Sequence, residues 1–408
     1  MPIVSTDRFA AGDRSLERAV GADRDVITVV PDRVGDRPGR GAEEKHMSRG
    51  CVGSGMFEKS TWIRLPRNVV VGHGVRSEVV DVVDDLHLQG RPLFVTSPTP
   101  REVAADPIAA DFEAAGIEPA IVTIEKATFD AVERVIEVAE AEGVSYLVGI
   151  GGGKAIDIAK LASHHLEMGF LSVPTAASHD GIVSNRGSVP DGDSRHSVAA
   201  EPPLAVVADT GILAEAPWEL TTAGCADIIS NYTAVMDWRL AQRLQDVEYS
   251  EYAAALSEMT AEILVDNADL IRPGLEESAW VVTKALMSSG VAMSIAGSSR
   301  PASGAEHLFS HQLDRLAPGA ALHGHQVGVG SIMTAYLHQG ADGIWRAIRD
   351  ALASIDAPTT AAELGIDDET VIEALTTCHE IRDRYTILGS GMNERAARDV
   401  ATKTGVID

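Results

Sequence analysis

The sequence predicts an α/β domain with a mostly parallel sheet, followed by an all-α domain. Between about residues 68 and 208, short apolar runs alternate with helical patterns, as expected for strands joined by crossover helices. After about residue 211, long helical patterns follow one another without a clear strand. We therefore expect an extension over residues 1–55, an α/β domain over residues 56–212 and a helical domain over residues 213–408.

The predicted strands are short, rich in β-branched residues and bounded by glycine, proline or polar residues. They cover residues 68–71, 92–96, 120–124, 146–150, 170–173 and 204–208. Helical periodicity is clear over residues 130–140 between these strands, and over residues 223–240, 277–296 and 326–337 in the second half. Parallel sheets bind ligands at the carboxyl ends of their strands, so the loops that follow the strands are the first candidates for a site.

Residues 1–55 have a different character from the rest of the chain. They contain many arginines, aspartates and glycines and show no sustained apolar period. Such a composition does not provide enough apolar surface to form a core. We expect a disordered or accessory extension here, with the first folded domain beginning near Met56.

The composition limits the possible partners. The chain of 408 residues carries 60 acidic and 34 basic side chains, a formal charge of −26, and only 7 of the basic residues are lysines. So acidic a surface repels nucleic acids and anionic membranes. Few lysines and many carboxylates suit a protein of a halophilic cytoplasm, although an ordinary acidic cytosolic protein is the simpler alternative.

Neither a membrane span nor a disulfide framework is predicted. No apolar run approaches the roughly eighteen residues that a transmembrane helix needs. The three cysteines, Cys51, Cys225 and Cys378, are odd in number and far apart, which favours reduced thiols. We expect a cytoplasmic protein with a small-molecule substrate.

A glycine-rich stretch follows the predicted strand over residues 146–150. It reads Gly-Gly-Gly-Lys-Ala from Gly151 to Ala155 and leads into a helical pattern. Glycines at such a turn allow the backbone to approach an anion closely and to direct free N–H groups at it. The stretch is neither a P-loop, because Lys154 precedes an alanine, nor a dinucleotide fingerprint, because the spacing differs. It predicts a phosphate cradle, although a tight structural turn is the alternative.

The loop after the next predicted strand is also rich in polar groups. Thr175, Ser178, His179 and Asp180 follow Val173 within seven residues. Ser-His-Asp-Gly is also ordinary turn chemistry. Since both loops follow parallel strands, we expect them at the same edge of the sheet, where they could share a ligand.

A metal-like set of residues lies in the second half. Asp227 is expected to open a helix, His307 and His311 are one helical turn apart, and His323 and His325 follow closely. One carboxylate and two imidazoles leave a divalent cation with an open position, as in catalytic zinc sites, and non-haem iron uses the same ligand types. The chain has no Cys-x-x-Cys pair and no Gly-x-Ser-x-Gly elbow. A zinc finger and a serine hydrolase are therefore disfavoured.

Five motifs together resemble a known family. They are Gly-Gly-Gly-Lys-Ala-Ile-Asp over residues 151–157, Pro-Thr-Ala-Ala-Ser-His-Asp-Gly-Ile-Val-Ser over 174–184, Gly-Cys-Ala-Asp over 224–227, Glu-His-Leu-Phe-Ser-His over 306–311 and His-Gly-His-Gln-Val-Gly-Val-Gly over 323–330. Over roughly residues 56–408 the chain is similar to the sn-glycerol-1-phosphate dehydrogenases of archaea. This family belongs with glycerol dehydrogenase, iron-containing alcohol dehydrogenases and 3-dehydroquinate synthase. The resemblance implies a dehydroquinate synthase-like fold.

The resemblance also implies roles for individual residues. It places NAD(P) in the α/β domain, and Zn²⁺, one per subunit, and substrate in the helical domain of a homo-oligomer. Residues implied to contact NAD(P) are Gly153, Lys154, Ala155, Ile156, Asp157, Thr175, Ala176, Ala177, Ser178 and Ser184. Asp227, His307 and His323 would bind the metal, whereas Asp180, Asp227 and His311 would face the substrate. His325 departs from the glutamate usual in relatives.

The implied reaction is reduction of dihydroxyacetone phosphate to sn-glycerol 1-phosphate, the backbone of archaeal membrane phospholipids. Arg186 and Arg300 are candidates for binding the substrate phosphate. The loop over residues 96–100 carries no acidic residue that would repel a 2′-phosphate, so we expect both NAD and NADP to be used.

Three alternatives stay open. Glycerol dehydrogenase would need no phosphate pocket. A 3-dehydroquinate synthase-type lyase would carry glutamate as its first metal ligand and a lysine-rich pocket, which Asp227 and the few lysines disfavour. A non-catalytic nucleotide-binding relative would have lost metal ligands, whereas all three are present here.

Overall fold

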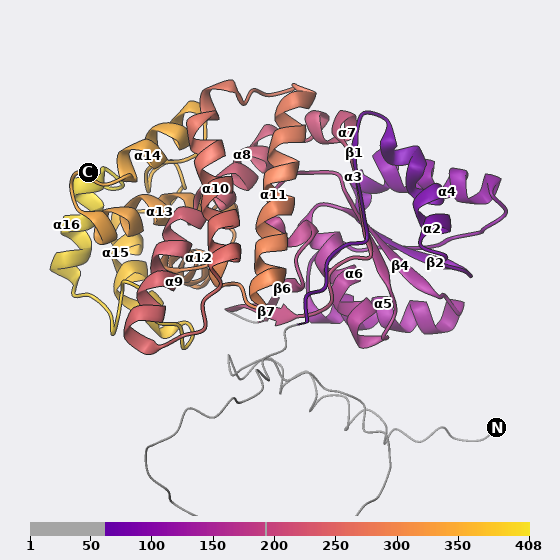
Figure 1. Ribbon diagram of the computed structural model, residues 1–408, viewed down its shortest axis with the longest axis horizontal. Helices are drawn as coiled ribbons and strands as arrows, with labels where there is room; N and C mark the ends of the chain where they lie inside the picture. The colour runs from indigo at the N-terminus through magenta and orange to yellow at the C-terminus, as the bar shows by residue number, and fades with distance from the viewer. Residues whose placement is uncertain (1–61, 192–193) are drawn as a thin grey trace, which may run out of the picture.

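A six-stranded sheet, parallel throughout, forms one half of the molecule (Figure 1). Its strands are β1 (Asn68–Gly72), β2 (Pro92–Thr96), β3 (Ala120–Thr123), β4 (Tyr146–Gly151), β5 (Phe170–Pro174) and β8 (Ala205–Asp209), in the spatial order β1-β8-β5-β4-β2-β3. All six agree with the predicted strands to within one residue at each end. This computed structural model describes residues 62–191 and 194–408, without the side chains of residues 190–197, so the predicted extension over residues 1–55 lies outside the described residues.

The sheet is buried on both faces, as expected for parallel strands covered by helices. Alternate residues of β2 point to opposite sides: Phe94 packs with Ile108 and Phe112, whereas Leu93 packs with the cluster on the other face. The cluster that contains Leu93 continues from this face of the sheet into the helical half. One buried apolar core therefore connects the sheet to the helices.

Apart from a two-stranded hairpin and the connecting loops, the rest of the described chain is helical. The α-helices are α2 (Val79–Asp85), α3 (Pro98–Pro100), α4 (Asp106–Ala114), α5 (Phe129–Glu142), α6 (Gly153–His165), α7 (Thr210–Glu215), α8 (Trp218–Ile229), α9 (Asn231–Gln245), α10 (Glu251–Asp266), α11 (Glu276–Ala296), α12 (Ala305–Leu316), α13 (His323–Gln339), α14 (Trp345–Ser354), α15 (Asp368–Thr377) and α16 (Glu394–Thr404). Short 3-10 or π segments are η2 (Val75–Glu78), η3 (Arg101–Ala105), η4 (Asp180–Ile182), η5 (Ala268–Leu270), η6 (Arg300–Ala302) and η7 (Cys378–Glu380).

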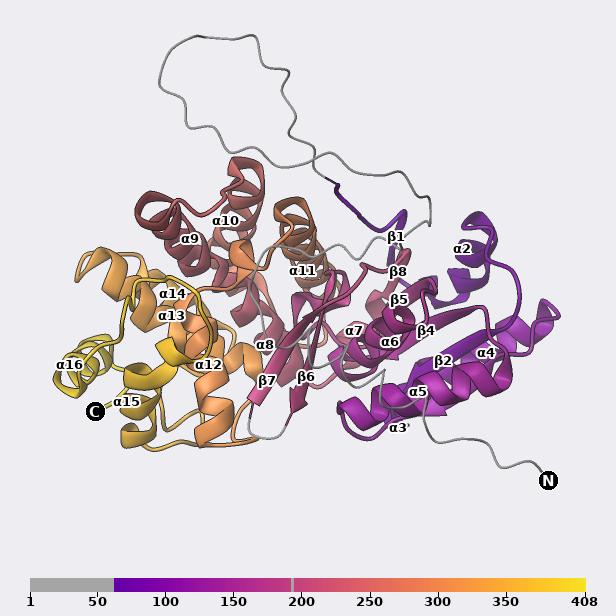
Figure 2. The same cartoon turned by 90° about the horizontal axis from the view of Figure 1, so that it is seen from below.

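Within the described residues no strand follows β8, so the helical character of the second half is confirmed. Figures 1 and 2 show helices α8 to α16 gathered on one side of the molecule and the sheet on the other. Of these helices, α11 lies at the boundary between the two sides. The division at residues 212 and 213 stays a prediction, although the last strand ends at Asp209.

One predicted helix is two helices in the structure. The pattern over residues 223–240 is interrupted at Ser230, where α8 ends and α9 begins. The hydroxyl of Ser230 donates to the carbonyl of Asp227 at 2.6 Å and so competes with the next backbone N–H for that acceptor. Apolar spacing alone did not reveal this local competition.

The antiparallel hairpin β6 (Arg186–Asp191) and β7 (Ser194–Ala199) was not predicted. Its strands contain few consecutive apolar residues, and Pro190 weakens a strand assignment. Asp191-Gly192 in the sequence was the available hairpin signal. The hairpin packs against α6 on one side and against α12 on the other, and so connects the two halves.

Helix α11 is the one helix of the described chain that is long and apolar enough to cross a membrane, with a mean hydropathy of 1.3 over its apolar window. However, 61% of that window is buried inside the fold. Core helices of this length commonly have such a composition. We read α11 as the central packing helix of the second half.

Candidate metal and cofactor site

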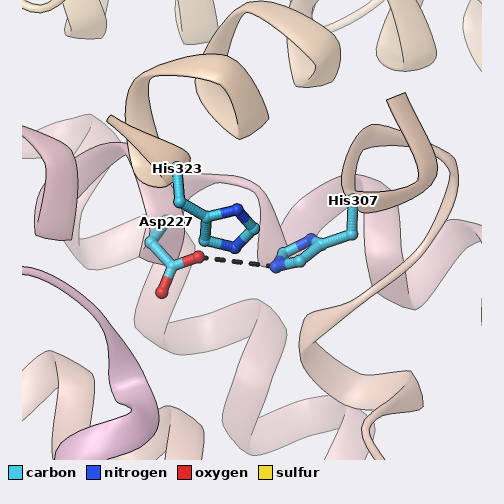
Figure 3. Close-up of side chains that lie close together, drawn as sticks. All are labelled: Asp227, His307 and His323. Atoms are coloured by element: carbon cyan, nitrogen blue, oxygen red, sulfur yellow. Dashed lines mark ion pairs between the residues drawn. The ribbon is translucent and has the colours of Figure 1, made fainter. Parts of the chain in front are cut away.

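Three side chains from three helices of the helical half lie close together (Figure 3). Asp227 lies in α8, His307 in the first turn of α12, and His323 is the first residue of α13. Each offers one ligand atom, and these atoms lie within 4.8 Å of one another. Asp227 does not open a helix, as we had expected, but lies near the carboxyl end of α8, because that helix already begins at Trp218.

Both imidazoles present the same ring nitrogen to the centre of this group. His307 Nδ1 lies 3.0 Å from Glu306 Oε1, and its Nε2 lies 3.5 Å from Asp227 Oδ1. His323 Nδ1 lies 2.8 Å from the hydroxyl of Ser310, so Nε2 is the ring nitrogen that would bind a cation. A carboxylate with two Nε2 donors fits a divalent cation with an open coordination position.

Glu306 is the polar group behind this site that the sequence analysis missed. Its side chain is fully buried, and besides His307 it accepts a hydrogen bond from the hydroxyl of Thr233 at 2.8 Å. It also accepts one from the backbone N–H of Gly304. Burial is the largest influence and would raise the pKa of the Glu306 carboxyl, but the hydrogen bond and charge of His307 together with backbone N–H donors lower this pKa below its usual value. Glu306 is thus a carboxylate that fixes the orientation of His307.

The charge around His307 favours a cation at this point. Burial alone would lower the pKa of the His307 imidazole, yet its hydrogen bonds to Asp227 and Glu306 raise that pKa to about 9. Without a metal, a proton on the imidazole therefore neutralises part of the negative charge of the two carboxylates. A divalent cation would do the same more fully.

Replacing Glu306 with glutamine is expected to weaken metal binding by roughly ten- to a hundredfold, as is typical of changes behind a metal ligand. Glutamine keeps the shape but removes the charge that holds the Nδ1 proton of His307. Metal affinity, measured by competition with a chelator, checks this prediction. Excess metal should restore most of the turnover, whereas unchanged metal affinity would show that Glu306 has no part in orienting His307.

The residues expected to face the substrate border the metal group. The backbone N–H of Asp180 donates to Asp227 Oδ2 at 3.2 Å, and the Asp180 carboxylate accepts from the hydroxyl of Ser289 on α11 at 2.8 Å. Burial, and then repulsion from Asp227, raises the pKa of the Asp180 carboxyl to about 7. The ring of His311 is stacked on that of His323 with centroids 5.6 Å apart. These two side chains and the metal group therefore lie together.

The glycine turn lies where the strand order reverses. Chain neighbours β2 and β3 extend the sheet one way, and β4 returns to the other side of β2. In such sheets nucleotides usually bind at the carboxyl ends of the strands where the order reverses, here β2 and β4. β4 ends at Gly151 and α6 begins at Gly153, so the first N–H groups of α6 lie at the carboxyl end of β4. The arrangement fits a dinucleotide pyrophosphate.

The side chains of the predicted cofactor-binding residues in the glycine stretch are bonded to other parts of the protein or buried. The Nζ of Lys154 donates to the backbone carbonyl of Glu125 at 2.8 Å, so its ammonium is used to fix a neighbouring loop. The Asp157 carboxylate is buried and accepts from Lys160 Nζ at 3.2 Å and from the N–H of Ser188 at 3.1 Å. Ala155 and Ile156 have buried side chains. Direct contacts of this stretch with a cofactor would therefore come mainly from backbone groups.

The second loop runs from the glycine turn to the metal group, as its position after β5 predicts. The N–H of Thr175 donates to the carbonyl of Gly151 at 3.0 Å, and Asp180 at the other end reaches Asp227. The residues between them are Ala176, Ala177, Ser178 and His179, and Ala176 and Ala177 are buried. Ser184 follows, buried, with its hydroxyl 3.4 Å from the carbonyl of Arg186.

Helix α8 approaches this loop so closely that only glycine fits at residue 224. A β-carbon there would lie 2.0 Å from the carbonyl oxygen of Ala177. This contact brings Asp227, one turn further along α8, next to Asp180. Gly224 in the Gly-Cys-Ala-Asp motif is thus explained by packing between the two halves.

His325 faces away from the metal-competent group, which is the set of Asp227, His307 and His323. Its Nε2 lies 2.8 Å from the hydroxyl of Thr222, and burial lowers the pKa of the His325 imidazole to about 4. A neutral imidazole packed on α8 therefore stands at the position where the resemblance leads us to expect glutamate. Arg186 begins β6, and Arg300 begins η6. Their suggested part in phosphate binding stays a prediction.

Comparisons with known proteins agree with this geometry. Residues 70–217 match the model of a family described as iron-containing alcohol dehydrogenase. A protein of Halobacterium salinarum named glycerol-1-phosphate dehydrogenase, NAD(P)+, is 74% identical over 352 residues, which cover 86% of this chain and 100% of that protein. A protein of the same name from Methanosarcina acetivorans is 55% identical and covers 85% of this chain and 97% of the relative.

Solved structures share the fold at lower identity. Glycerol dehydrogenase of Schizosaccharomyces pombe superposes with a TM-score of 0.69 at 19% identity, covering 85% of this chain and 92% of the other. Sulfoacetaldehyde reductase of Bifidobacterium kashiwanohense, in complex with NAD+, gives a TM-score of 0.67 at 14% identity, covering 86% and 100%. These likenesses confirm the predicted fold class. The high identities to the curated relatives show that the chain belongs to the glycerol-1-phosphate dehydrogenase family of oxidoreductases, whose members are NAD(P)-dependent and related to the metal-dependent alcohol dehydrogenases.

Proposed function

We propose that this chain reduces dihydroxyacetone phosphate to sn-glycerol 1-phosphate with NAD(P)H and a bound Zn²⁺, and so supplies the backbone of archaeal membrane phospholipids. The observation that carries the proposal is the loop over residues 174–184. One end of it is bonded to the glycine turn that fits a pyrophosphate, and Asp180 is bonded to the metal-competent group. Cofactor, substrate and metal would therefore meet on one segment.

The residues of the site have distinct parts in this proposal. Asp227, His307 and His323 would hold the cation, and the first turn of α6 would hold the cofactor pyrophosphate. When bound, the cation supplies Lewis-acid polarisation of the substrate carbonyl, and NAD(P)H supplies the hydride. Asp180 and His311 would orient the substrate. His311, or a water molecule beside it, would relay the proton that completes the alcohol.

Zinc is the cation that we propose, and the donor set fits it. Three protein ligands of one carboxylate and two imidazoles, with an open position, are typical of catalytic zinc. Non-haem iron uses the same ligand types, so metal analysis of the purified protein decides between them. The homo-oligomer, the cytoplasmic location and the use of both cofactors stay predictions. Relatives from halophiles agree with the expectation of a salt-adapted protein.

The substrate is tested by comparing dihydroxyacetone phosphate with dihydroxyacetone, which has the same carbonyl but no phosphate. NAD(P)H oxidation by the full-length protein is followed in molar salt, and the configuration of the product is determined with enantiospecific enzymes. We expect fast oxidation only with the phosphate ester, and the sn-glycerol 1-phosphate enantiomer. Preference for dihydroxyacetone, or for glycerol in the reverse direction, would favour the glycerol dehydrogenase alternative and overturn the proposal.

A further inference from the structure

The imidazole of His179 lies directly on the first residue of α6. A β-carbon built at Gly153 would lie 1.6 Å from His179 Nε2, so the ring occupies the space that any larger residue at 153 would need. The ring is only partly buried. His179 thus stands beside the first N–H groups of α6, at the carboxyl end of β4.

The other ring nitrogen of His179 fixes which atom carries the proton. The backbone N–H of Gly181 donates to His179 Nδ1 at 2.8 Å. An acceptor nitrogen has no proton, so in the neutral imidazole the proton is on Nε2. The Nε2–H group is therefore a hydrogen-bond donor next to the first turn of α6.

The ring of His179 and the backbone N–H of Asp180 point in different directions. His179 is extended, with φ −170° and ψ 162°, so successive groups point to opposite sides. Its ring lies against Gly153, whereas the N–H of Asp180 is directed to Asp227 and the metal group. His179 thus belongs to the nucleotide side of the loop and Asp180 to the metal side.

We propose that His179 is a cofactor-positioning residue, whose Nε2–H donates to a pyrophosphate oxygen of NAD(P) held at the N-terminus of α6. The backbone N–H groups of the helix and the imidazole would then bind the same anion from two sides. Since the same loop continues to Asp180, a pyrophosphate bound to His179 also fixes the position of the substrate side of the loop. This inference rests on the NAD(P)-binding part of the proposed function.

Two substitutions test the Nε2–H donor of His179 and its contact with Gly181 separately. His179→Asn keeps an acceptor near the position of Nδ1, which can bind the Gly181 N–H, but removes the distal donor. His179→Gln keeps a distal N–H donor but loses the acceptor beside Gly181. The exposed His165, in the last turn of α6, provides the matched control His165→Asn.

Binding of NADH and of ADP-ribose, which carries the pyrophosphate without the nicotinamide, is measured by titration calorimetry in molar salt. We expect His179→Asn to weaken both by roughly ten- to a hundredfold, the effect of losing one hydrogen bond to a charged group. His179→Gln should recover much of this loss, and His165→Asn should bind as the unchanged protein does. Melting temperature and metal content verify that each variant is folded.

The outcomes are separable. If His179→Asn binds ADP-ribose as tightly as the unchanged protein, the ring serves the turn alone and the inference is wrong. If both His179 variants lose affinity equally, a distal donor does not restore binding, and the inference is also wrong. If instead the KM for dihydroxyacetone phosphate rises while ADP-ribose affinity is unchanged, the ring serves the substrate phosphate, which also overturns it. Failure of the unchanged protein to bind either ligand would contradict the proposed function itself.

Discussion

Replacing His307 with alanine is expected to reduce the rate of dihydroxyacetone phosphate reduction by about a thousandfold or more, because metal polarisation of a carbonyl contributes several kcal/mol to the transition state. The substitution removes one of the three ligand atoms that lie within 4.8 Å of one another. It also leaves the Glu306 carboxylate, which is fully buried, without the imidazole that it holds at 3.0 Å. Both effects oppose metal binding.

This prediction is checked by steady-state kinetics together with the metal content of the purified variant. His165→Ala, at an exposed position on α6, is the control and should retain full activity. We expect NADH binding by the His307 variant to be nearly unchanged, since the glycine turn is in the other half of the molecule. Normal turnover with normal metal content would remove His307 from the site.

Replacing Asp227 with asparagine is expected to lower metal affinity by about a hundredfold or more. This loss is larger than the loss expected when a residue that contacts a metal ligand, such as Glu306, is replaced. Asparagine retains an oxygen that can accept the Asp180 N–H, now bonded to Asp227 Oδ2 at 3.2 Å. The packing of the loop should therefore survive while the negative charge is lost. The remaining His307 and His323 would bind a divalent cation without an anionic ligand.

Chelator competition and turnover at saturating metal measure the two consequences separately. Excess metal should restore metal occupancy but not the full rate. The reason is that the negative charge of Asp227 also raises the pKa of the Asp180 carboxyl, and asparagine lacks this charge. The control is Asp130→Asn, at an exposed position in the first turn of α5. An Asp227 variant with unchanged metal affinity would show that the cation binds elsewhere.

The strands and the metal group were predictable because each has a local signature. The apolar runs that become β2, β4 and β5 are short, β-branched and bounded by breakers, and they are buried on both faces of the sheet. The metal group could be found because four of the thirteen histidines, at 307, 311, 323 and 325, lie within nineteen positions. The roles of the individual site residues and the domain boundaries stay predictions.

The parts that the sequence did not reveal depend on contacts between distant residues. Glu306 orients His307 only because Thr233, 73 residues away, and Gly304 satisfy its other lone pairs. Lys160 is fully buried and donates to the carbonyls of Gly181 at 2.5 Å and Arg186 at 2.6 Å, which fixes the loop that carries Asp180. Periodicity cannot show such partners, since each is created by the packing of separate elements.

The orientation of a side chain was likewise not readable from a motif. Lys154 stands in the glycine stretch, but its ammonium is bonded to Glu125. His179 looked like turn chemistry, and it does accept from Gly181 within the turn. Its ring nevertheless lies on α6, because both Gly153 and Gly181 leave room for it. A residue can therefore serve a turn and face a ligand at once.

The central claim is that Asp227, His307 and His323 hold one Zn²⁺ that is needed to reduce dihydroxyacetone phosphate. The most direct test removes metal from the full-length protein with a chelator in molar salt and then titrates Zn²⁺ back while NADH oxidation is measured. We predict negligible activity in the metal-free protein, with NADH still bound, and full recovery at one Zn²⁺ per subunit. Undiminished reduction by metal-free protein, or recovery with Fe²⁺ alone, would contradict this assignment.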